Sequence, residues 1–428
     1  MKRRITLIAF LMSFALAWAE EKQDGEKLEQ LEQKVDVLTQ EIERIRLGEV
    51  VEPTLESAYG LGPAASKVYH VKKGVSIAGY GEMVYKNFSS EREDGTDSGA
   101  TDQIDLLRAV LYTGYKFTDK ILLNSEIEFE HAGEEVSVEF AYIDYNAWPE
   151  LGFRAGMVLI PVGLINEQHE PIAFHGANRP NVERNIIPTT WRENGAGVYG
   201  EIGPFVYRTY VVAGLNAENF SAGSGLRSGR QNGSESSIED AAWTARVDYV
   251  GLPGLLAGAS TFIGNSGQDP DEDFDAKVTL WDLHAKYEWQ ALETRALYTQ
   301  ATITDVGEIN AIPREDTDDD GELDTGLTGN KSVGEKLYGG YLETAYNVFS
   351  PLGFSQYLAP FFRWERYNTQ ENVPGGFTEN PANNRTEFTY GLTYKPIDNL
   401  ALKFDYQDMN NKADAGVNQV NLGIGYVF

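Results

Sequence analysis

Arginine and histidine side chains gather in one stretch of the chain, from Val162 to Arg192. The stretch contains Arg179, Arg184 and Arg192, His169 and His175, and Glu167, Glu170 and Glu183. A guanidinium group can bind a carboxylate or a phosphate through two parallel hydrogen bonds, so such a cluster indicates a site for small anions. The alternative is that some of these arginines bind carboxylates elsewhere in the chain, such as those between Glu126 and Glu130, and anchor the stretch.

A second candidate site is an acidic run with the spacing of a calcium-binding loop. Such a loop places oxygen ligands at positions 1, 3, 5 and 9 and glycine at position 6. The matching residues are Asp316, Asp318, Asp320, Gly321 and Asp324, and Glu322 completes the candidate ligand set. Position 12 is Leu327, where a bidentate glutamate would sit, so we expect weakened calcium affinity. A solvated acidic loop without bound metal is the alternative.

Other basic residues lie in segments where apolar and polar residues alternate, and parity places them on the polar face. The candidate site residues among them are Arg108, Arg154, Arg208 and Arg363. Several bases have an acid two residues away on the same face: Arg246 with Asp248, Arg295 with Glu293, Arg363 with Glu365, and Lys403 with Asp405. Either these pairs neutralise each other and stabilise a wall, or a basic and an acidic wall together orient a dipolar or anionic solute.

The alternation of apolar and polar residues has a period of two from Val75 onward, which is typical of strands. In the last strand Leu422, Ile424 and Tyr426 share one face, and Asn421 and Gly423 share the other. The pattern predicts strands near 75–88, 103–117, 121–131, 136–146, 152–161, 193–202, 205–215, 241–250, 255–263, 277–289, 293–303, 336–349, 357–367, 385–395, 400–409 and 418–428. One apolar face and one polar face suit lipid outside and water inside.

The predicted connections between these strands alternate in length. Short ones, such as 118–120 and 203–204, alternate with long ones, such as 162–192 and 304–335. This alternation is typical of an outer-membrane barrel, whose short turns are periplasmic and whose long loops are external. We therefore predict an all-β fold, a 16-stranded antiparallel transmembrane β-barrel over 75–428. A secreted β-sandwich or propeller is the competing fold, but it would not need charged residues on the opposite face of nearly every strand.

The N-terminal part of the chain divides into three predicted segments. Basic residues followed by an apolar run and the small-x-small pattern Ala17-Trp18-Ala19 indicate a secretory signal peptide over 1–19. Apolar residues from Leu28 to Ile45 follow a heptad spacing, which predicts a short periplasmic coiled-coil helix over 20–47. A solitary amphipathic helix is the alternative. Glycines and prolines then indicate a linker over 48–74.

Composition excludes several classes of protein. The chain has 65 acidic and 36 basic residues among 428, a formal net charge of −29, so we expect no nucleic-acid partner. It has no cysteine, which excludes disulfides and thiolate metal sites. None of its five histidines accompanies a recognisable hydrolase motif, so we expect no enzyme and no required cofactor. A binding or adhesion barrel is the alternative function.

Three stretches resemble the region around the third loop of the phosphate-selective porin family. They are Leu151–Gly163, Val182–Pro188 and Trp191–Gly200. Tyr338–Tyr346, Pro360–Tyr367 and the terminal Phe428 are similar to the late strands of that family. The predicted coiled-coil arm is similar to that of a branch whose members take up dicarboxylates and related organic anions.

This resemblance implies a homotrimer of sixteen-stranded pores in the bacterial outer membrane, in contact with lipid and lipopolysaccharide. It also implies that the third loop folds inward as a constriction. Glu183 and Arg184 match the family pattern, but the chain has no conspicuous ladder of closely spaced inward arginines. We therefore expect a channel for small hydrophilic solutes that prefers anions such as dicarboxylates or phosphate, without strict phosphate specificity.

Overall fold

The computed structural model describes residues 56–268, 274–314 and 325–428. The predicted signal peptide and coiled-coil helix lie outside the described residues. So do all the candidate calcium ligands from Asp316 to Asp324. These three predictions are therefore untested by the structure.

Sixteen antiparallel strands in the described part form a closed barrel, in which each strand pairs with its sequence neighbours and β1 also pairs with β16. The strands are β1 (Gly74–Phe88), β2 (Gln103–Lys116), β3 (Ile121–Glu130), β4 (Glu135–Trp148), β5 (Leu151–Leu159), β6 (Arg192–Ile202), β7 (Phe205–Ala213), β8 (Ala241–Tyr249), β9 (Leu255–Gly264), β10 (Val278–Trp289), β11 (Leu292–Ile303), β12 (Lys336–Tyr346), β13 (Tyr357–Asn372), β14 (Asn384–Ile397), β15 (Leu400–Asn411) and β16 (Gln419–Val427). Every predicted strand is present. The largest difference is β13, which continues beyond its predicted end at Tyr367.

The barrel wall separates an apolar exterior from a polar interior, as the alternation predicts. On β16 the outward side chains of Leu422, Ile424 and Tyr426 are 50%, 39% and 43% exposed, whereas the inward Asn421 is fully buried. The same parity recurs on β15, where Leu402 and Phe404 are exposed. An exterior of this kind matches the lipid-facing band of a membrane barrel. In the part of the chain that the structure describes, no helix is long and apolar enough to cross a membrane.

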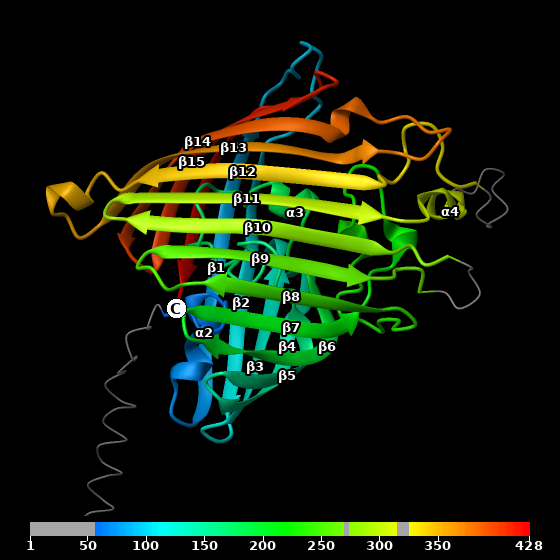
Figure 1. Ribbon diagram of the computed structural model, residues 1–428. Helices are drawn as coiled ribbons and strands as arrows, with labels where there is room; N and C mark the ends of the chain where they lie inside the picture. The colour runs from blue at the N-terminus through cyan, green and yellow to red at the C-terminus, as the bar shows by residue number, and fades with distance from the viewer. Residues whose placement is uncertain (1–55, 269–273, 315–324) are drawn as a thin grey trace, which may run out of the picture. The chain divides into compact units, whose positions relative to one another are not determined.

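The connections between strands differ on the two sides of the barrel. Figure 1 shows the short connections at the left, including 290–291 between β10 and β11, and the long ones at the right, including 373–383 between β13 and β14. The β3–β4 connection is the exception on the long-loop side, because only the short helix η1 (His131–Gly133) and Glu134 separate the two strands. The start of β1 and the end of β16 both lie on the short-turn side.

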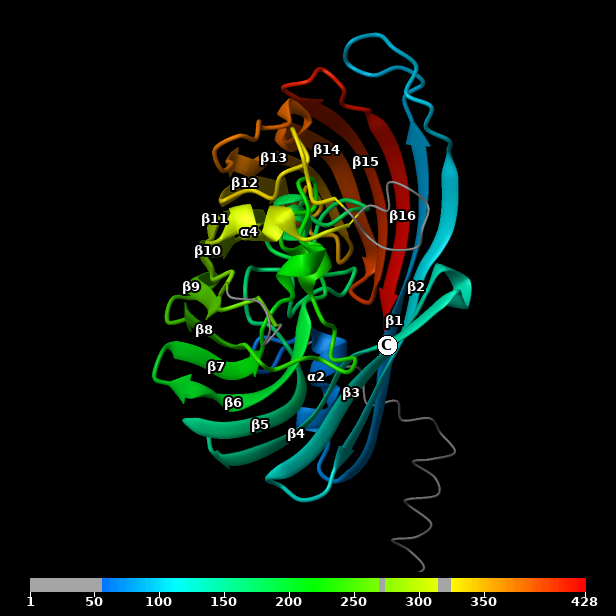
Figure 2. The same cartoon turned by 90° about the vertical axis from the view of Figure 1, so that its right-hand side faces the viewer.

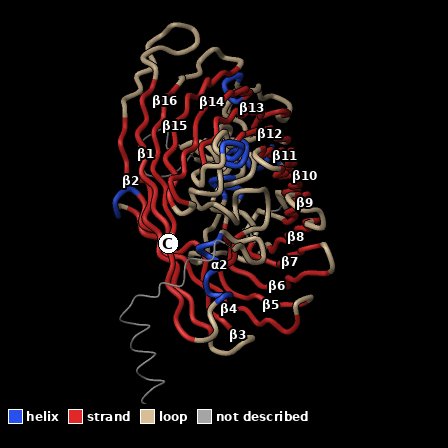
Figure 3. Tube along the Cα trace, turned by 90° about the vertical axis from the view of Figure 1, so that its left-hand side faces the viewer, coloured by secondary structure: helices blue, strands red, loops and turns tan. Residues whose placement is uncertain are grey.

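Part of the predicted linker is a helix inside the barrel. Residues Pro63–His70 form α2, with Gly62 at the N-cap and Pro63 in the first turn, where its missing N–H leaves no donor unpaired. Figures 2 and 3 show α2 within the ring of strands. The apolar Ala64, Ala65 and Val68 are buried. Eight residues are too few for helical periodicity to stand out in a sequence, which is why the linker prediction missed α2.

Contacts with the wall hold α2 in place. The Asn124 side chain of β3 donates to the Ala65 carbonyl at 2.9 Å, and Lys116 of β2 donates to the Tyr69 carbonyl at 3.0 Å. Gly114 of β2 allows the close approach, because a Cβ there would lie 2.5 Å from Val68 Cγ2. The N-terminal segment that leads into β1 therefore occupies part of the lumen.

Candidate functional site

The connection between β5 and β6, residues 160–191, enters the lumen as the predicted third loop does, and we call it the constriction loop. Its short helix α3 (Val182–Asn185), labelled in Figure 1, lies against β12 and β13. Its backbone donates to carboxylates of the opposite wall: Ala177 N–H to Asp405 at 2.6 Å and Val182 N–H to Glu365 at 3.0 Å. The loop thus spans the lumen between β5 and the wall formed by β13 to β15.

Asn166 joins the two ends of the constriction loop. Its side-chain amide donates to the carbonyls of Ile160 and Trp191 at 2.8 and 2.9 Å, and its oxygen accepts from the Trp191 N–H at 2.8 Å. Glu183, further along the loop, accepts from the Ile165 N–H at 2.8 Å. These internal bonds make the loop a preorganised element.

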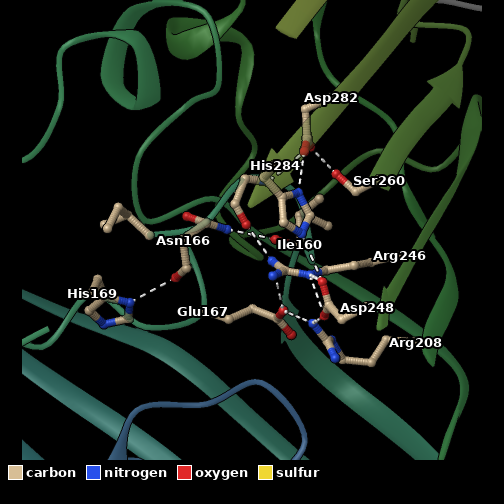
Figure 4. A network of polar contacts seen from close by, with 12 residues as sticks. Ile160, Asn166, Glu167, His169, Arg208, Arg246, Asp248, Ser260, Asp282 and His284 are labelled. Carbon is tan, nitrogen blue, oxygen red and sulfur yellow. Dashed lines mark hydrogen bonds and ion pairs between the residues drawn. The ribbon is translucent and has the colours of Figure 1, made fainter. Parts of the chain in front are cut away.

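A network of buried charges fastens the constriction loop to β7, β8 and β10 (Figure 4). Glu167 of the loop lies 2.8 Å from Arg208, which lies 3.0 Å from Asp248. Asp248 also contacts Arg246 at 2.8 Å and His284 at 2.7 Å. Each of these side chains is buried, so each needs its partners to offset the loss of hydration.

The inward arginines predicted to line the pore are mostly paired with wall carboxylates. Arg154 lies 2.8 Å from Asp144, and Arg363 lies 3.1 Å from Glu343 and 2.9 Å from Glu365. Arg154, Arg208 and Arg363 line neither of the two cavities described below. The structure therefore favours a wall-stabilising role for these three residues.

The predicted pairs of bases and acids two residues apart are present in three of four cases. Arg246 contacts Asp248, Arg295 contacts Glu293, and Arg363 contacts Glu365. Lys403 and Asp405 share the inward face of β15 as predicted, but they form no ion pair among the described residues. Asp405 instead accepts from the constriction loop and from Asn421, and the Lys403 ammonium lies 3.7 Å from the centre of the Phe174 ring.

Two neighbouring cavities of about 400 and 470 Å³ lie in the lumen beside the constriction loop. Both are lined by Lys86, Asn178, Asn181 and Arg184. The first is also lined by Arg179, Arg192, Arg227 and Arg230. We call Lys86, Arg179, Arg184, Arg227 and Arg230 the basic cluster. It joins β1, the constriction loop and the long connection 214–240.

The basic cluster lies beside acidic residues but is not paired with them. Among the described residues, none of its five side chains forms an ion pair. Arg179 donates to the His169 carbonyl at 3.3 Å, and Arg230 donates to the carbonyls of Thr189 and Arg227. Burial, and then the neighbouring arginines, lower the pKa of Arg227 and of Arg230 to about 10. Both remain charged at neutral pH, so the cluster concentrates positive charge.

The acidic residues that line the same cavity are already partly neutralised. Arg108 lies 3.6 Å from Glu82, 3.4 Å from Glu128 and 3.5 Å from Glu130. Arg192 lies 3.4 Å from Glu139. Arg192, the first residue of β6, therefore pairs with a wall carboxylate, whereas Arg179 and Arg184 of the constriction loop face the cavity without such a partner.

Sequence reasoning found Arg179 and Arg184 but missed Lys86, Arg227 and Arg230. Lys86 lies on β1 with the inward parity of Glu82, a signal that was available. Arg227 begins the short helix η3 (Arg227–Gly229), and Arg230 follows it directly. The sequence of this connection predicts an ordinary external loop. The pattern gave no indication that this connection turns towards the lumen.

A closed barrel of sixteen antiparallel strands with an apolar exterior and a charged lumen has the architecture of porins. The structure is similar to OmpF of Salmonella typhi (TM-score 0.53, 15% identity, 83% of this chain and 98% of that one). It is also similar to an anion-selective porin of Comamonas acidovorans (TM-score 0.50, 12% identity, 83% and 100%). A loop-deleted OmpT of Vibrio cholerae is a third such structure (TM-score 0.51, 12% identity, 84% and 100%). Identities this low show a shared fold.

The chain belongs to the same family as an uncharacterized protein of Aquifex aeolicus (strain VF5). The two are 41% identical over 383 residues, which cover 87% of this chain and 84% of that protein. No model of a known protein family matches the sequence. The porin fold of the resemblance is thus confirmed, and its phosphate-selective branch stays a prediction.

The charge network predicts a stability effect. Replacing Asp248 with Asn removes one of the two carboxylates that Arg208 and Arg246 share, so these buried arginines keep only Glu167. We expect a loss of up to roughly 3–5 kcal/mol in the free energy of unfolding. The measurement is denaturant unfolding of the detergent-solubilised protein, followed by circular dichroism. The control is Glu288→Gln, because the Glu288 side chain is 54% exposed and contacts Lys286 at the surface. Equal stability of the two variants would contradict the role of the network.

The position of α2 predicts an effect on ion flow. Deleting residues 56–70 removes α2 from the lumen, so we expect a larger single-channel conductance in a planar bilayer. Gly114→Val provides a milder version, because the added side chain overlaps Val68 and displaces the helix. A Gly375→Ala control alters a loop glycine with no atom within 4 Å of the added methyl group. Unchanged conductance in both the deletion and Gly114→Val would show that α2 does not restrict the pore.

Proposed function

We propose that this protein is an outer-membrane porin that lets small hydrophilic solutes diffuse through its lumen, with a preference for anions. The observation that carries the proposal is the basic cluster, in which five cationic side chains face luminal cavities without a carboxylate partner among the described residues. Elsewhere in the lumen, most inward arginines are paired with acids. The unpaired cations therefore set the sign of the potential where a solute passes the constriction loop.

Electrostatics explains why so few groups can determine selectivity. A narrow aqueous passage between low-dielectric walls focuses the field of the charges that line it, so nearby counter-ions are concentrated. The overall charge of −29 does not oppose this, because surface charges more than about 10 Å away are screened at physiological salt. The local arrangement of charges in the lumen therefore affects ion selectivity more than the net charge of the chain does.

The cluster indicates the class of solute. Guanidinium groups bind the planar, bidentate face of a carboxylate or the oxygens of a phosphate, whereas a lysine acts as a point charge. The two cavities share Arg184 and Lys86 and together exceed the volume of one small anion. Dicarboxylates and inorganic phosphate are the proposed solutes. The Comamonas acidovorans porin, which has a similar fold, is anion-selective, and this is compatible with the proposal.

The setting of the channel is part of the proposal. The apolar exterior suits the bilayer of a bacterial outer membrane, with lipopolysaccharide on the long-loop side and the N-terminal arm in the periplasm. We propose a homotrimer, to which a coiled coil over 20–47 would contribute.

Calcium binding at Asp316 to Asp324 is a further proposal. Protection of that loop from proteolysis at millimolar calcium tests it. No catalytic role is proposed for any residue.

Reversal potentials in a salt gradient test the anion preference. Replacing Arg179 or Arg184 with Ala removes unpaired positive charge, so we expect the reversal potential to shift towards that of a cation-selective pore, with a larger shift in the double variant. The matched control is Arg92→Ala, because Arg92 is exposed in the connection between β1 and β2 and lines neither cavity.

Three outcomes separate the alternatives. Ion current with unchanged selectivity in both variants would contradict the role of the cluster but leave a weakly selective porin. A wild-type protein that inserts into bilayers and carries no current would favour a binding or adhesion barrel. A shift of equal size in Arg92→Ala would assign selectivity to the external surface.

A further inference from the structure

Three side chains from three elements meet at one buried point between the constriction loop and the wall. His169 Nε2 lies 3.2 Å from Glu126 Oε1 of β3 and 3.2 Å from Glu139 Oε2 of β4. The ligand atoms of the three residues all lie within 4.8 Å of one another. The residues are 2%, 0% and 1% exposed, respectively. The charge network of Figure 4 lies elsewhere along the same loop, and it shares only the Asn166–His169 contact with this group.

Two carboxylate oxygens at this point lack a hydrogen-bond partner in the structure. They are Glu126 Oε2 and Glu139 Oε2, and the second is the atom that faces His169 Nε2. A single N–H of the imidazole can point at one acceptor only, and the geometry gives that hydrogen bond to Glu126. A buried carboxylate oxygen without a partner is destabilising by about 1–3 kcal/mol or more. A cation between the carboxylates would supply the missing partner.

The histidine is oriented as a metal ligand would be. Its Nδ1 lies 2.8 Å from the backbone carbonyl of Asn166, which can only accept, so Nδ1 carries a proton. Nε2 is the nitrogen that can bind a cation once its own proton has left. A ligating histidine typically donates its other ring N–H to such a carbonyl. Asn166 is itself fixed by Ile160 and Trp191. The other oxygen of Glu139 accepts from Arg192 at 3.4 Å, which orients that carboxylate.

The spacing and charge of the group fit a divalent ion. Two ligands that each lie about 2.0–2.2 Å from one tetrahedral ion are separated by about 3.4 Å. The observed nitrogen–oxygen distances of 3.2 Å are close to this value. A neutral imidazole and two carboxylates carry a charge of −2 that a divalent cation balances. Imidazole ligation favours first-row transition metals over Ca²⁺ and Mg²⁺, which prefer all-oxygen sites.

We propose that Glu126, Glu139 and His169 form a site for a divalent transition-metal ion, such as Zn²⁺, that joins the constriction loop to β3 and β4. Three protein ligands leave at least one coordination position for water. The site also borders the anion path, because Glu139 lines the first cavity together with Arg179 and Arg184. Bound metal would neutralise Glu139 and make that cavity more positive.

A proton competes with the metal ion for His169 Nε2. Burial lowers the pKa of His169, but Glu126 and Glu139 outweigh burial and raise it to about 10. Without metal, His169 is therefore an imidazolium at neutral pH, and a metal ion has to displace its proton. Metal binding is best measured at pH 8, because protons compete with the metal ion less strongly there than at lower pH.

The test uses the full-length protein in detergent, stripped with a chelator and titrated with Co²⁺ and with Zn²⁺. We expect one equivalent of metal per chain at this site, with visible Co²⁺ absorption bands that Zn²⁺ removes. X-ray absorption of the wild-type complex should show one imidazole nitrogen and carboxylate oxygens at about 2.0–2.2 Å. This readout needs no variant and does not depend on channel activity.

Variants locate the bound ion. His169→Gln and Glu139→Gln should each weaken binding at least about tenfold. The matched control is His175→Gln, because His175 is a buried histidine of the same loop that faces one carboxylate, Glu293, at 3.7 Å. Circular dichroism verifies that each barrel is folded.

Two results would overturn the proposal. If the wild-type protein binds no stoichiometric metal, His169 acts as an imidazolium that bridges two carboxylates. If binding persists undiminished in both His169→Gln and Glu139→Gln, the ion lies elsewhere, for example on an acidic external loop. Either result leaves the proposed anion channel standing, because that proposal is tested by reversal potentials.

Discussion

Satisfaction of backbone hydrogen bonds in an apolar surrounding is the constraint on which this structure depends. Lipid offers no partner for an unpaired N–H or C=O group, so a sheet that faces lipid has to close on itself. The pairing of β1 with β16 removes the last free edge. Once the sheet is closed, the period-two alternation of the strands forces one set of side chains outward and the other set into the lumen.

The inward set then creates a second requirement, because charged side chains crowd a narrow interior. Most of them pair across or along the strands, as Arg363 does with Glu343 and Glu365. The constriction loop joins this scheme through Glu167, which contacts Arg208 and Arg246. A loop fixed by buried ion pairs can keep other side chains in place without pairing them. Arg179 and Arg184 are such side chains, and they define the proposed anion path.

The metal site and the anion path are linked through the same loop. His169 and Arg179 are ten residues apart, and Arg179 donates to the His169 carbonyl. An ion at Glu126, Glu139 and His169 would stabilise the part of the loop that carries Arg179. The helix α2 approaches from the other side, where Glu170 accepts from the Ala65 N–H at 3.0 Å. The constriction loop is therefore the element through which the wall, the N-terminal segment and the cavities are coupled.

The sequence by itself determined the strands, their order and their two faces, because a period of two and the length of each connection are local properties. It also identified Arg179 and Arg184 as candidates, since their loop is rich in guanidinium groups. Only the tertiary structure decided which arginines remain unpaired, that Arg227, Arg230 and Lys86 join them, and that α2 folds into the lumen. Those outcomes depend on which strands face each other around a closed ring and where a loop turns, and no local pattern specifies such contacts between residues far apart in the chain.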